Sequence, residues 1–451
     1  MVCLHILNPK QPKMKTPKPL KVLIILYYWP PAGGPGVQRW LKFVKYLKQF
    51  NVVPTVFAPE NPHYPTVDES LEFEVTPDID VIKSPINEPY KVASVFSEKE
   101  TNTLSKGIIK EHQKQSLIQK AMLFTRGNLF IPDARALWIK PSVKRISKLL
   151  KDRQFDAIVT TGPPHSLHRI GFHLKEKFQD LPWVADFRDP WTNIGYHDQL
   201  KLSESSKKKH QDMEKEVLMT ANAIVVTSPG TQKEFKAKTN TPVHLITNGY
   251  DDAEVNFEPD EHFSLVHIGT LLSERNPENL WIAIAELIEE DKVFESNLEL
   301  RFVGQVSENL VESVHDHKLQ DHARFLGYMP HKQAQQEMFN SQVLLLIEKN
   351  KTETQDIIPG KLFEYLQSQR PILGIGPKDW DVSGLVKDHK SGFTFGYNDK
   401  DEIKLCIKGY YQAFMKGKLF IKPKGIESYH RKQLTEKLAE LIQQQVSQTA
   451  V

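Results

Sequence analysis

The sequence contains 451 residues, of which 39% are hydrophobic and 25% charged, with a formal net charge of +3. Because domains average roughly 100–200 residues, this length predicts two globular domains, and the small net charge argues against nucleic acid as a partner. The two cysteines, Cys3 and Cys406, are far apart in the chain. This spacing excludes a disulfide framework and a cysteine-based zinc site, and it favours a reducing, cytoplasmic compartment.

The chain begins with a polar segment, residues 1–19, that is rich in lysine and proline and is expected to be a disordered tail. The segment lacks the apolar core of a signal peptide, and no apolar run elsewhere reaches the roughly 18 residues that a membrane-spanning helix needs. We therefore expect a cytoplasmic protein, and any contact with the inner face of a membrane would be peripheral.

Residues 20–252 alternate short apolar runs with amphipathic stretches. The runs expected to be strands are residues 21–28, 52–58, 155–161, 183–187 and 223–228. Continuous apolar strands that alternate with helices predict a parallel sheet covered on both faces. This part of the chain is therefore expected to form a doubly wound, Rossmann-like α/β domain.

A second series of the same kind follows a linker near residues 250–262. Its expected strands are residues 263–270, 298–304, 323–328, 341–348, 371–376 and 392–396. The pattern predicts a second doubly wound domain, residues 253–426, and the two domains would face a cleft. A last helix, at about 427–447, is placed so that it could pack back on the first domain.

The stretch from residue 90 to 150 departs from this alternation. It is rich in lysine and arginine and is expected to be mostly helical, with a break at the sequence IPDAR. Two interpretations stay open. The charges could lie on solvated helix faces, or they could form a basic surface for an anionic acceptor or a lipid interface, since basic amphipathic helices bind membranes.

Three glycines, Gly33, Gly34 and Gly36, lie between the first expected strand and the following helix. At such a turn the backbone N–H groups and the helix dipole suit an anion. The motif departs from the dinucleotide pattern GxGxxG because position 39 is arginine, and no acid ends the second strand to hold a ribose, so a nicotinamide-dependent dehydrogenase is disfavoured. The loop is either a tight turn or a substrate-facing segment.

Two further loops follow strands of the first sheet, at the carboxyl ends where ligands bind in this architecture. His165, after the third strand, would contact substrate or cap the next helix. After the fourth strand, the segment ADFRDPW brings Asp186, Arg188 and Asp189 together. These three charges form either a structural brace or a cluster that binds substrate.

The second domain opens with a glycine loop and a cation. Gly269 closes its first strand, and Arg275 follows six positions later. A glycine loop beside a cation is a reasonable cradle for a diphosphate, although the signal is weak alone.

The segment DIIPGKLFEYL, residues 356–366, combines a loop with a helix start. Gly360 and Lys361 lie where first-turn N–H groups would face an anion. Glu364 lies one turn into the helix, and Asp356 lies on the loop before it. From this segment alone, an ordinary helix with an acid in its first turn, which interacts favourably with the helix dipole, is the favoured interpretation.

Taken in order, these landmarks resemble the retaining nucleotide-sugar glycosyltransferases of the GT-B fold, family 4, of the type found in bacterial polysaccharide gene clusters. The resemblance extends from about residue 20 to 445. It rests on PAGGPG after the first strand, NGYD at 248–251, Gly-x-Leu at 269–271 followed by Arg275, FVG at 302–304, FLGY at 325–328, and two acids, Asp356 and Glu364, spaced as in E-x7-E.

Three positions depart from the family pattern. The first acid is Asp356 rather than glutamate, which shortens its reach to the donor sugar. Arg188 and Asp189 occupy the neighbourhood in which many members carry a histidine, and Thr270 follows Gly269 where many carry an arginine. The acceptor side is therefore where this chain is expected to differ most.

The resemblance implies transfer of a sugar from a nucleoside diphosphate to an acceptor hydroxyl, with retention at the anomeric carbon, in the synthesis of a cell-surface polysaccharide or glycolipid. Residues 20–252 would form the acceptor side and residues 253–426 the nucleotide-sugar side. The implied site residues are, for the donor and its phosphates, Gly269, Arg275, Gly360, Lys361 and Glu364; for the acceptor side, Gly33, Gly34, Arg188 and Asp189; and for catalysis, Asp356, Glu364, His165 and Asp186.

The sequence contains no cluster with the spacing of a metal site, so we expect a metal-independent enzyme without a cofactor. The expected partners are a nucleoside-diphosphate sugar and a saccharide or lipid-linked acceptor. Two alternatives stay open, which are a sugar-nucleotide epimerase of the same fold and a catalytically silent nucleotide-binding scaffold.

Overall fold

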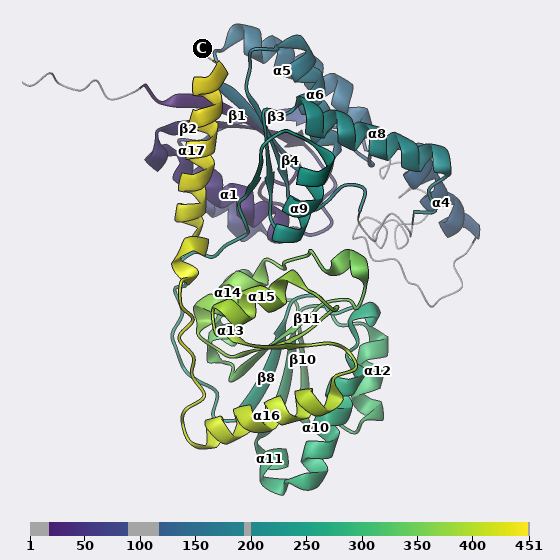
Figure 1. Ribbon diagram of the computed structural model, residues 1–451, viewed down its shortest axis with the longest axis vertical. Coiled ribbons are helices and arrows are strands. Elements are labelled where there is room, and N and C mark those ends of the chain that lie inside the picture. Colours follow the sequence, from purple (N-terminus) through teal and green to yellow (C-terminus); the bar gives the residue numbers. More distant parts are fainter. Residues whose placement is uncertain (1–17, 89–116, 194–199, 450–451) are drawn as a thin grey trace, which may run out of the picture.

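The computed structural model describes residues 18–88, 117–193 and 200–449. These residues form two α/β domains that lie end to end along the long axis of the molecule (Figure 1), each built on one parallel sheet. The two sheets confirm the predicted fold class. Most of the tail expected at residues 1–19, and the part of the basic stretch before residue 117, lie outside the described residues.

The N-terminal sheet has seven parallel strands in the order β3-β2-β1-β4-β5-β6-β7, so its order reverses between β1 and β4. The strands are β1 (Leu20–Ile25), β2 (Val52–Glu60), β3 (Asp80–Pro85), β4 (Ala157–Gly162), β5 (Trp183–Phe187), β6 (Ala223–Val226) and β7 (Val243–Leu245). The edge strand β3 did not appear among the apolar runs of the sequence, because three of its six residues are polar and only Ser84 is buried.

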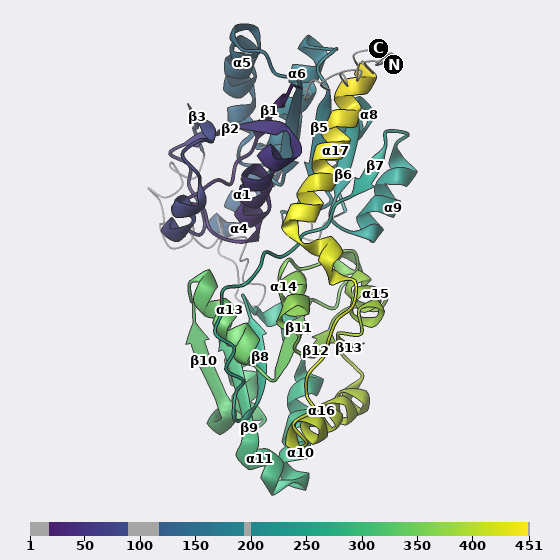
Figure 2. The same cartoon turned by 90° about the vertical axis from the view of Figure 1, so that its left-hand side faces the viewer.

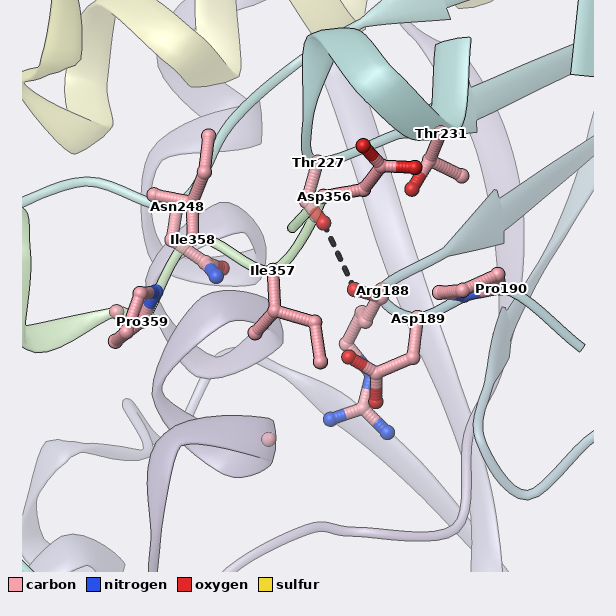
Figure 3. A pocket seen from close by; sticks show the side chains of 12 residues that line it. Arg188, Asp189, Pro190, Thr227, Thr231, Asn248, Asp356, Ile357, Ile358 and Pro359 are labelled. Atoms are coloured by element: carbon pink, nitrogen blue, oxygen red, sulfur yellow. Dashed lines mark hydrogen bonds between the residues drawn. The ribbon is translucent and has the colours of Figure 1, made fainter. Parts of the chain in front are cut away.

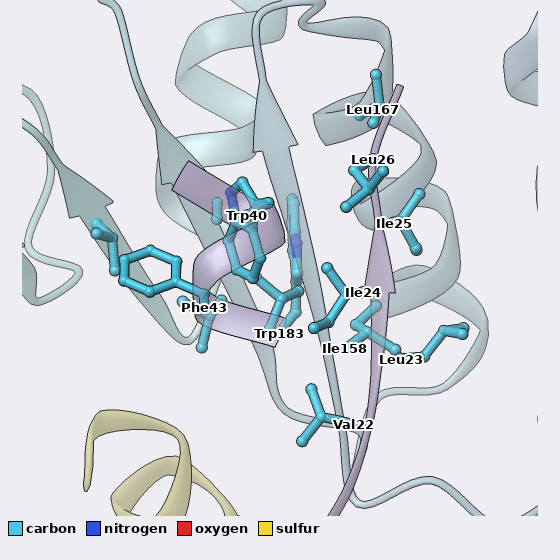
Figure 4. Close-up of a cluster of buried hydrophobic side chains, with 14 of the residues drawn as sticks. Val22, Leu23, Ile24, Ile25, Leu26, Trp40, Phe43, Ile158, Leu167 and Trp183 are labelled. Carbon is cyan, nitrogen blue, oxygen red and sulfur yellow. The ribbon is translucent and has the colours of Figure 1, made fainter. Parts of the chain in front are cut away.

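Helices cover both faces of this sheet. They are α1 (Pro35–Leu47), α5 (Ala136–Asp152), α6 (Ser166–Lys177), α8 (Glu204–Thr220) and α9 (Pro229–Lys238), with short turns of 3-10 helix at Lys48–Phe50 and Glu69–Glu74. A further helix, α4 (Leu117–Asn128), contributes none of its described side chains to the core of this domain. The core of this domain is well buried. Ile24 of β1, for example, has no exposed surface and lies beside Trp40 and Trp183 (Figure 4). Burial on both faces explains why β1 reads as a continuous apolar run.

The C-terminal sheet has six parallel strands in the order β10-β9-β8-β11-β12-β13. They are β8 (Phe263–Ile268), β9 (Leu298–Val303), β10 (Ala323–Gly327), β11 (Val343–Ile347), β12 (Ile372–Ile375) and β13 (Gly392–Phe395). The covering helices are α10 (Glu278–Glu290), α11 (Lys292–Asn297), α12 (Glu308–Asp316), α13 (His331–Asn340), α14 (Lys361–Ser368), α15 (Asp381–Asp388) and α16 (Lys400–Met415). One core lies between the sheet and α10 and α16, and a second lies under α13, α14 and α15.

The last helix, α17 (Arg431–Thr449), leaves the C-terminal domain and lies along α1 of the N-terminal domain (Figure 2). Its apolar face, which includes Leu438 and Ile442, belongs to the N-terminal core. Where the chain crosses back, the N–H of Tyr250 donates to the Tyr429 carbonyl at 3.1 Å, and the N–H of Arg431 donates to the Tyr250 carbonyl at 2.8 Å. The two crossings between the domains therefore lie side by side.

No helix within the described ranges is both long and apolar enough to cross a bilayer.

Candidate active site between the domains

Two cavities lie between the domains, a larger one of about 520 Å³ and a smaller one of about 180 Å³. Asn248, Ile357, Pro359 and Gly360 line both of them, so the cavities adjoin. Most of the lining residues follow the carboxyl ends of strands, for example Gly34 after β1, Thr227 after β6, Gly269 after β8 and Glu348 after β11. This is the edge of a doubly wound sheet at which ligands bind.

The larger cavity brings together Gly269, Lys361 and Arg275, the expected diphosphate cradle. Gly269 has a φ of 113°, in the left-handed region that favours glycine, and Lys361 is the first residue of α14. The Lys361 ammonium group donates to the Ile268 carbonyl at 2.9 Å and lies 3.2 Å from Nε2 of His267. A cation therefore lies beside a glycine turn and a helix start, as an anion site requires.

Burial lowers the pKa of Lys361 from its ordinary value to about 7, and the nearby positive charge of Arg275 acts in the same direction. Burial and the charge of Lys361 also hold the pKa of His267 well below its usual range. His267 is thus a neutral imidazole, whose Nδ1 lies 3.2 Å from the Leu345 carbonyl. If Nδ1 carries the proton and donates there, Nε2 is left to accept from Lys361.

Arg275 does not face the cavity alone, because it pairs with Glu348. The Arg275 Nε and Nη2 atoms donate to Oε1 of Glu348 at 3.0 and 2.8 Å. The Glu348 side chain is almost completely buried. Sequence reasoning missed Glu348, although an acid placed directly after the buried strand β11 was the available signal. The pair fixes the position of the guanidinium in the lining of the larger cavity.

Glu364 lines the same cavity and forms a 2.9 Å contact with Nε2 of His331. Burial raises the pKa of the Glu364 carboxyl, but the hydrogen bond from His331 and the charge of Arg431 outweigh burial, so the pKa lies below its ordinary value. The same hydrogen bond raises the pKa of His331. Glu364 is therefore an ionised carboxylate inside the cavity. Neither His331 nor Arg431 was singled out from the sequence.

The smaller cavity is lined by Arg188 and Asp189 from the N-terminal domain and by Asp356 from the C-terminal domain (Figure 3). Thr227 Oγ1 donates to the Arg188 carbonyl at 2.8 Å, which fixes the loop after β5. Asp356 packs against Gly230 in the first turn of α9, so closely that a Cβ atom at position 230 would collide with the carboxylate. Burial, followed by the charges of Asp381 and Glu234, raises the pKa of Asp356.

Asp186, expected to be catalytic, lines neither cavity. Its carboxylate is completely buried and accepts hydrogen bonds from Arg39, Trp40 and Thr161 at 2.8 Å each. Arg39 in turn donates to the carbonyls at positions 246 and 247, which ties α1 to the start of the inter-domain segment. Of the two interpretations of the segment ADFRDPW, this position favours the structural brace for Asp186.

His165 also lies apart from both cavities. Its ring is 1% exposed and stacks on Trp191, with the ring centroids 4.8 Å apart and the planes nearly parallel. His168 is fully buried, and burial lowers its pKa to about 3. Gly33 is absent from both linings as well, whereas Gly34 lines the larger cavity. The catalytic role expected for His165 therefore has no support in its position.

Across the residues that the structure describes, no group of three or more His, Cys, Asp or Glu side chains is arranged to hold a metal ion. Metal independence stays a prediction.

No protein-family model matches the chain, and no match is found among curated proteins. Solved structures do match over nearly the whole chain. Sucrose-phosphate synthase from Thermosynechococcus elongatus aligns with a TM-score of 0.58 at 13% identity, over 94% of this chain and 98% of the other. WaaG, a glycosyltransferase involved in lipopolysaccharide biosynthesis, aligns with a TM-score of 0.53 at 11% identity, over 94% and 99%.

A third structure is a variant of TarM from S. aureus in complex with fondaparinux, α-GlcNAc-glycerol and UDP. It aligns with a TM-score of 0.56 at 11% identity, over 95% of this chain and 99% of the other. The chain has the GT-B fold. Structural similarity at identities this low establishes the fold alone, so the chemistry has to be argued from the site.

Proposed function

We propose that this protein is a retaining glycosyltransferase that moves a sugar from a nucleoside diphosphate to an acceptor hydroxyl in polysaccharide or glycolipid synthesis. The observation that carries the proposal is the joint position of Gly269, Lys361 and Glu364 in one cavity between two GT-B domains. A cation at a helix start suits a diphosphate, and an ionised carboxylate close by suits the two hydroxyls of a ribose.

In this proposal the nucleotide occupies the larger cavity and the transferred sugar reaches the smaller one. Lys361 and the N-terminus of α14 stabilise the negative charge that develops on the leaving diphosphate, with Arg275 beside them. Glu364 accepts hydrogen bonds from the ribose, held in orientation by His331. Asp356, which lines the smaller cavity, accepts a hydrogen bond from a hydroxyl of the donor sugar. The domains on either side exclude water that would hydrolyse the donor.

A thermal-shift panel of UDP-, GDP- and ADP-sugars tests the donor site, because a ligand that binds only the folded protein raises the melting temperature by mass action. At a concentration about 100 times the dissociation constant, the stabilisation is about 2.7 kcal/mol. We expect one base to produce a clear shift and Glu364→Gln to reduce it. The absence of any shift with all three would contradict the proposal.

The reaction products distinguish the proposed glycosyltransferase from the two alternatives, a sugar-nucleotide epimerase and a catalytically silent scaffold. A glycosyltransferase consumes the donor quickly only when an acceptor is present, and NMR of the product reports the configuration at the anomeric carbon. Turnover of the sugar nucleotide into a second sugar nucleotide without any acceptor would favour the epimerase. Binding without turnover in the presence of an acceptor extract would favour the silent scaffold.

Donor binding is expected to take up a proton through Lys361. The pKa of Lys361 is about 7 in the free protein, and the diphosphate charge raises it. At pH 8 the free amine is mostly neutral and the bound one mostly charged, so binding takes up close to one proton. At pH 6 the free amine is already charged, and uptake falls. The affinity is therefore highest below pH 7 and declines as the pH rises through the pKa of the bound state.

Isothermal titration calorimetry in buffers with different ionisation enthalpies measures this uptake. A sugar nucleotide is a suitable ligand because each of its phosphates carries one ester and shares the anhydride bond, so neither titrates near neutral pH. The variant Lys361→Met is the control and should show no uptake at pH 8. Equal uptake by both proteins would assign the proton to another group, such as His331.

A further inference from the structure

The smaller cavity contains a half-buried cation, Arg188, that forms no ion pair with a carboxylate among the described residues. The Arg188 side chain forms one hydrogen bond, from Nη2 to the Pro163 carbonyl, and its Nε atom is buried without a partner among the described residues. The guanidinium also lies 5.7 Å from the centre of the Tyr28 ring. Burial lowers the pKa of Arg188, and the nearby charges of Asp189 and Asp186 oppose this effect only in part. A cation taken out of water in this way is costly unless an anion meets it.

The surroundings of Arg188 leave room for such an anion. The guanidinium Nη1 lies against Gly36 in the first turn of α1, and any side chain at position 36 would collide with it. The positive end of the α1 dipole therefore points at the same place as the guanidinium. Arg188 and Gly36 both line the cavity of about 180 Å³. At roughly 30 Å³ for each water, this volume corresponds to about six waters, which suits one small ring and not a nucleotide.

Two carboxylates flank the cavity and limit which anion fits. Asp189 and Asp356 line it, and neither has a hydrogen-bond partner among the described residues. A phosphate monoester carries a charge of about −1.5 to −2 near neutral pH, so these carboxylates would repel it more strongly than a singly charged carboxylate. The same two acids are good acceptors for hydroxyl groups. A ring that carries hydroxyls and one carboxylate satisfies all three side chains.

We propose that the smaller cavity binds a uronic acid, a sugar ring with a carboxylate that pairs with Arg188 and with hydroxyls that donate to Asp189 and Asp356. This inference rests on the proposed function and adds the class of sugar to it. The uronic acid has two sources. It is either the donor sugar, joined to the nucleotide across the shared lining at Asn248 and Gly360, or the acceptor residue.

Paired ligands that differ only in the carboxylate test the proposal. The dissociation constants of UDP-glucuronate and UDP-glucose, and of GDP-mannuronate and GDP-mannose, are measured for the full-length protein. Free glucuronate and glucose are measured with and without UDP. We expect the wild type to favour one acidic ligand over its neutral partner about tenfold or more, as a charge-assisted hydrogen bond predicts. In Arg188→Gln the ratio should fall to about one.

The sugar-nucleotide pairs and the free-sugar pair show whether the carboxylate belongs to the donor or to the acceptor. A preference among intact sugar nucleotides assigns the carboxylate to the donor, whereas a preference shown only by free glucuronate assigns it to the acceptor. Equal affinities within every pair in the wild type would overturn the inference, as would a preference that survives in Arg188→Gln. If no nucleotide or sugar nucleotide binds at all, the proposed function falls, and the free glucuronate titration alone then decides the inference.

Arg169→Gln is the control, because Arg169 is a largely buried arginine that pairs with Glu216 on α8, and neither residue lines either of the two cavities. This variant should keep the preference for the acidic ligand. The melting temperature and UDP affinity of Arg188→Gln show whether that variant is folded. A folded Arg188→Gln that binds UDP normally and loses only the acidic preference is the result that supports the inference.

Discussion

Replacement of Lys361 with methionine is expected to lower kcat/KM for the sugar nucleotide about 100-fold or more. Lys361 begins α14, and its ammonium group lies beside the glycine turn at Gly269. Charged or polar groups that face a developing negative charge in a dry site are each worth about 10²–10³ in rate, and methionine keeps the length of the side chain without the charge. Initial rates of donor consumption with acceptor measure the effect.

The matched control is Lys404→Met. Lys404 pairs with Glu286 and Glu290 on the outer surface of the C-terminal domain and lines neither cavity. Its replacement should leave kcat/KM within about twofold, since exposed ion pairs contribute little. A wild-type kcat/KM for the Lys361→Met enzyme would contradict the assignment of the diphosphate to this part of the cavity. A loss confined to KM would show that Lys361 binds the donor without favouring the transition state.

The fold was largely predictable because its strands are buried on both faces and therefore appear as unbroken apolar runs. The strand β11, with sequence VLLLI, is an example, and all five of its residues are buried. The edge strand β3 was missed because an edge strand needs no such run. Its neighbours lie on one side only, so the hydrophobic pattern that identifies a central strand is absent.

The residues that meet at the larger cavity were predictable for a similar reason. Gly269 and Lys361 lie at the carboxyl end of a strand and at the start of a helix, and parallel strands bring such positions to one edge. Their partners were not predictable. His331 lies 33 residues before Glu364, and Glu348 lies 73 residues after Arg275, so no local pattern connects either pair. Such contacts depend on how distant loops meet after folding.

His165 follows β4 and Asp186 lies near the end of β5, yet neither residue lines either cavity. Position near the carboxyl end of a strand does not decide which way a side chain points. His165 turns toward Trp191, and Asp186 turns toward Arg39. The buried carboxylate of Asp186 is stabilised by Arg39, which lies 147 residues earlier in the chain, and no local sequence pattern indicates this pairing.

Asp186→Asn is expected to destabilise the N-terminal domain by about 3–5 kcal/mol, because it leaves the buried guanidinium of Arg39 without its counter-ion. Asparagine keeps the shape of the side chain, so the loss reports charge and hydrogen bonding and not a cavity. For a domain of this size the melting temperature would fall by about 6–20 °C in calorimetry. The control Asp80→Asn breaks an exposed pair with Arg153 and should cost less than about 1 kcal/mol.

Activity measured below the melting temperature of Asp186→Asn separates a brace from a catalytic group. The Asp186 carboxylate is completely buried, accepts from Trp40 and Thr161 as well as Arg39, and lines neither cavity. A structural brace predicts that the folded variant keeps most of its turnover while its stability falls. A variant as stable as the wild type but about 100-fold slower would restore the catalytic role. Loss of a structural brace lowers the stability and leaves the rate largely unchanged, whereas loss of a catalytic group lowers the rate and leaves the stability unchanged. Measuring both quantities therefore decides between the two roles.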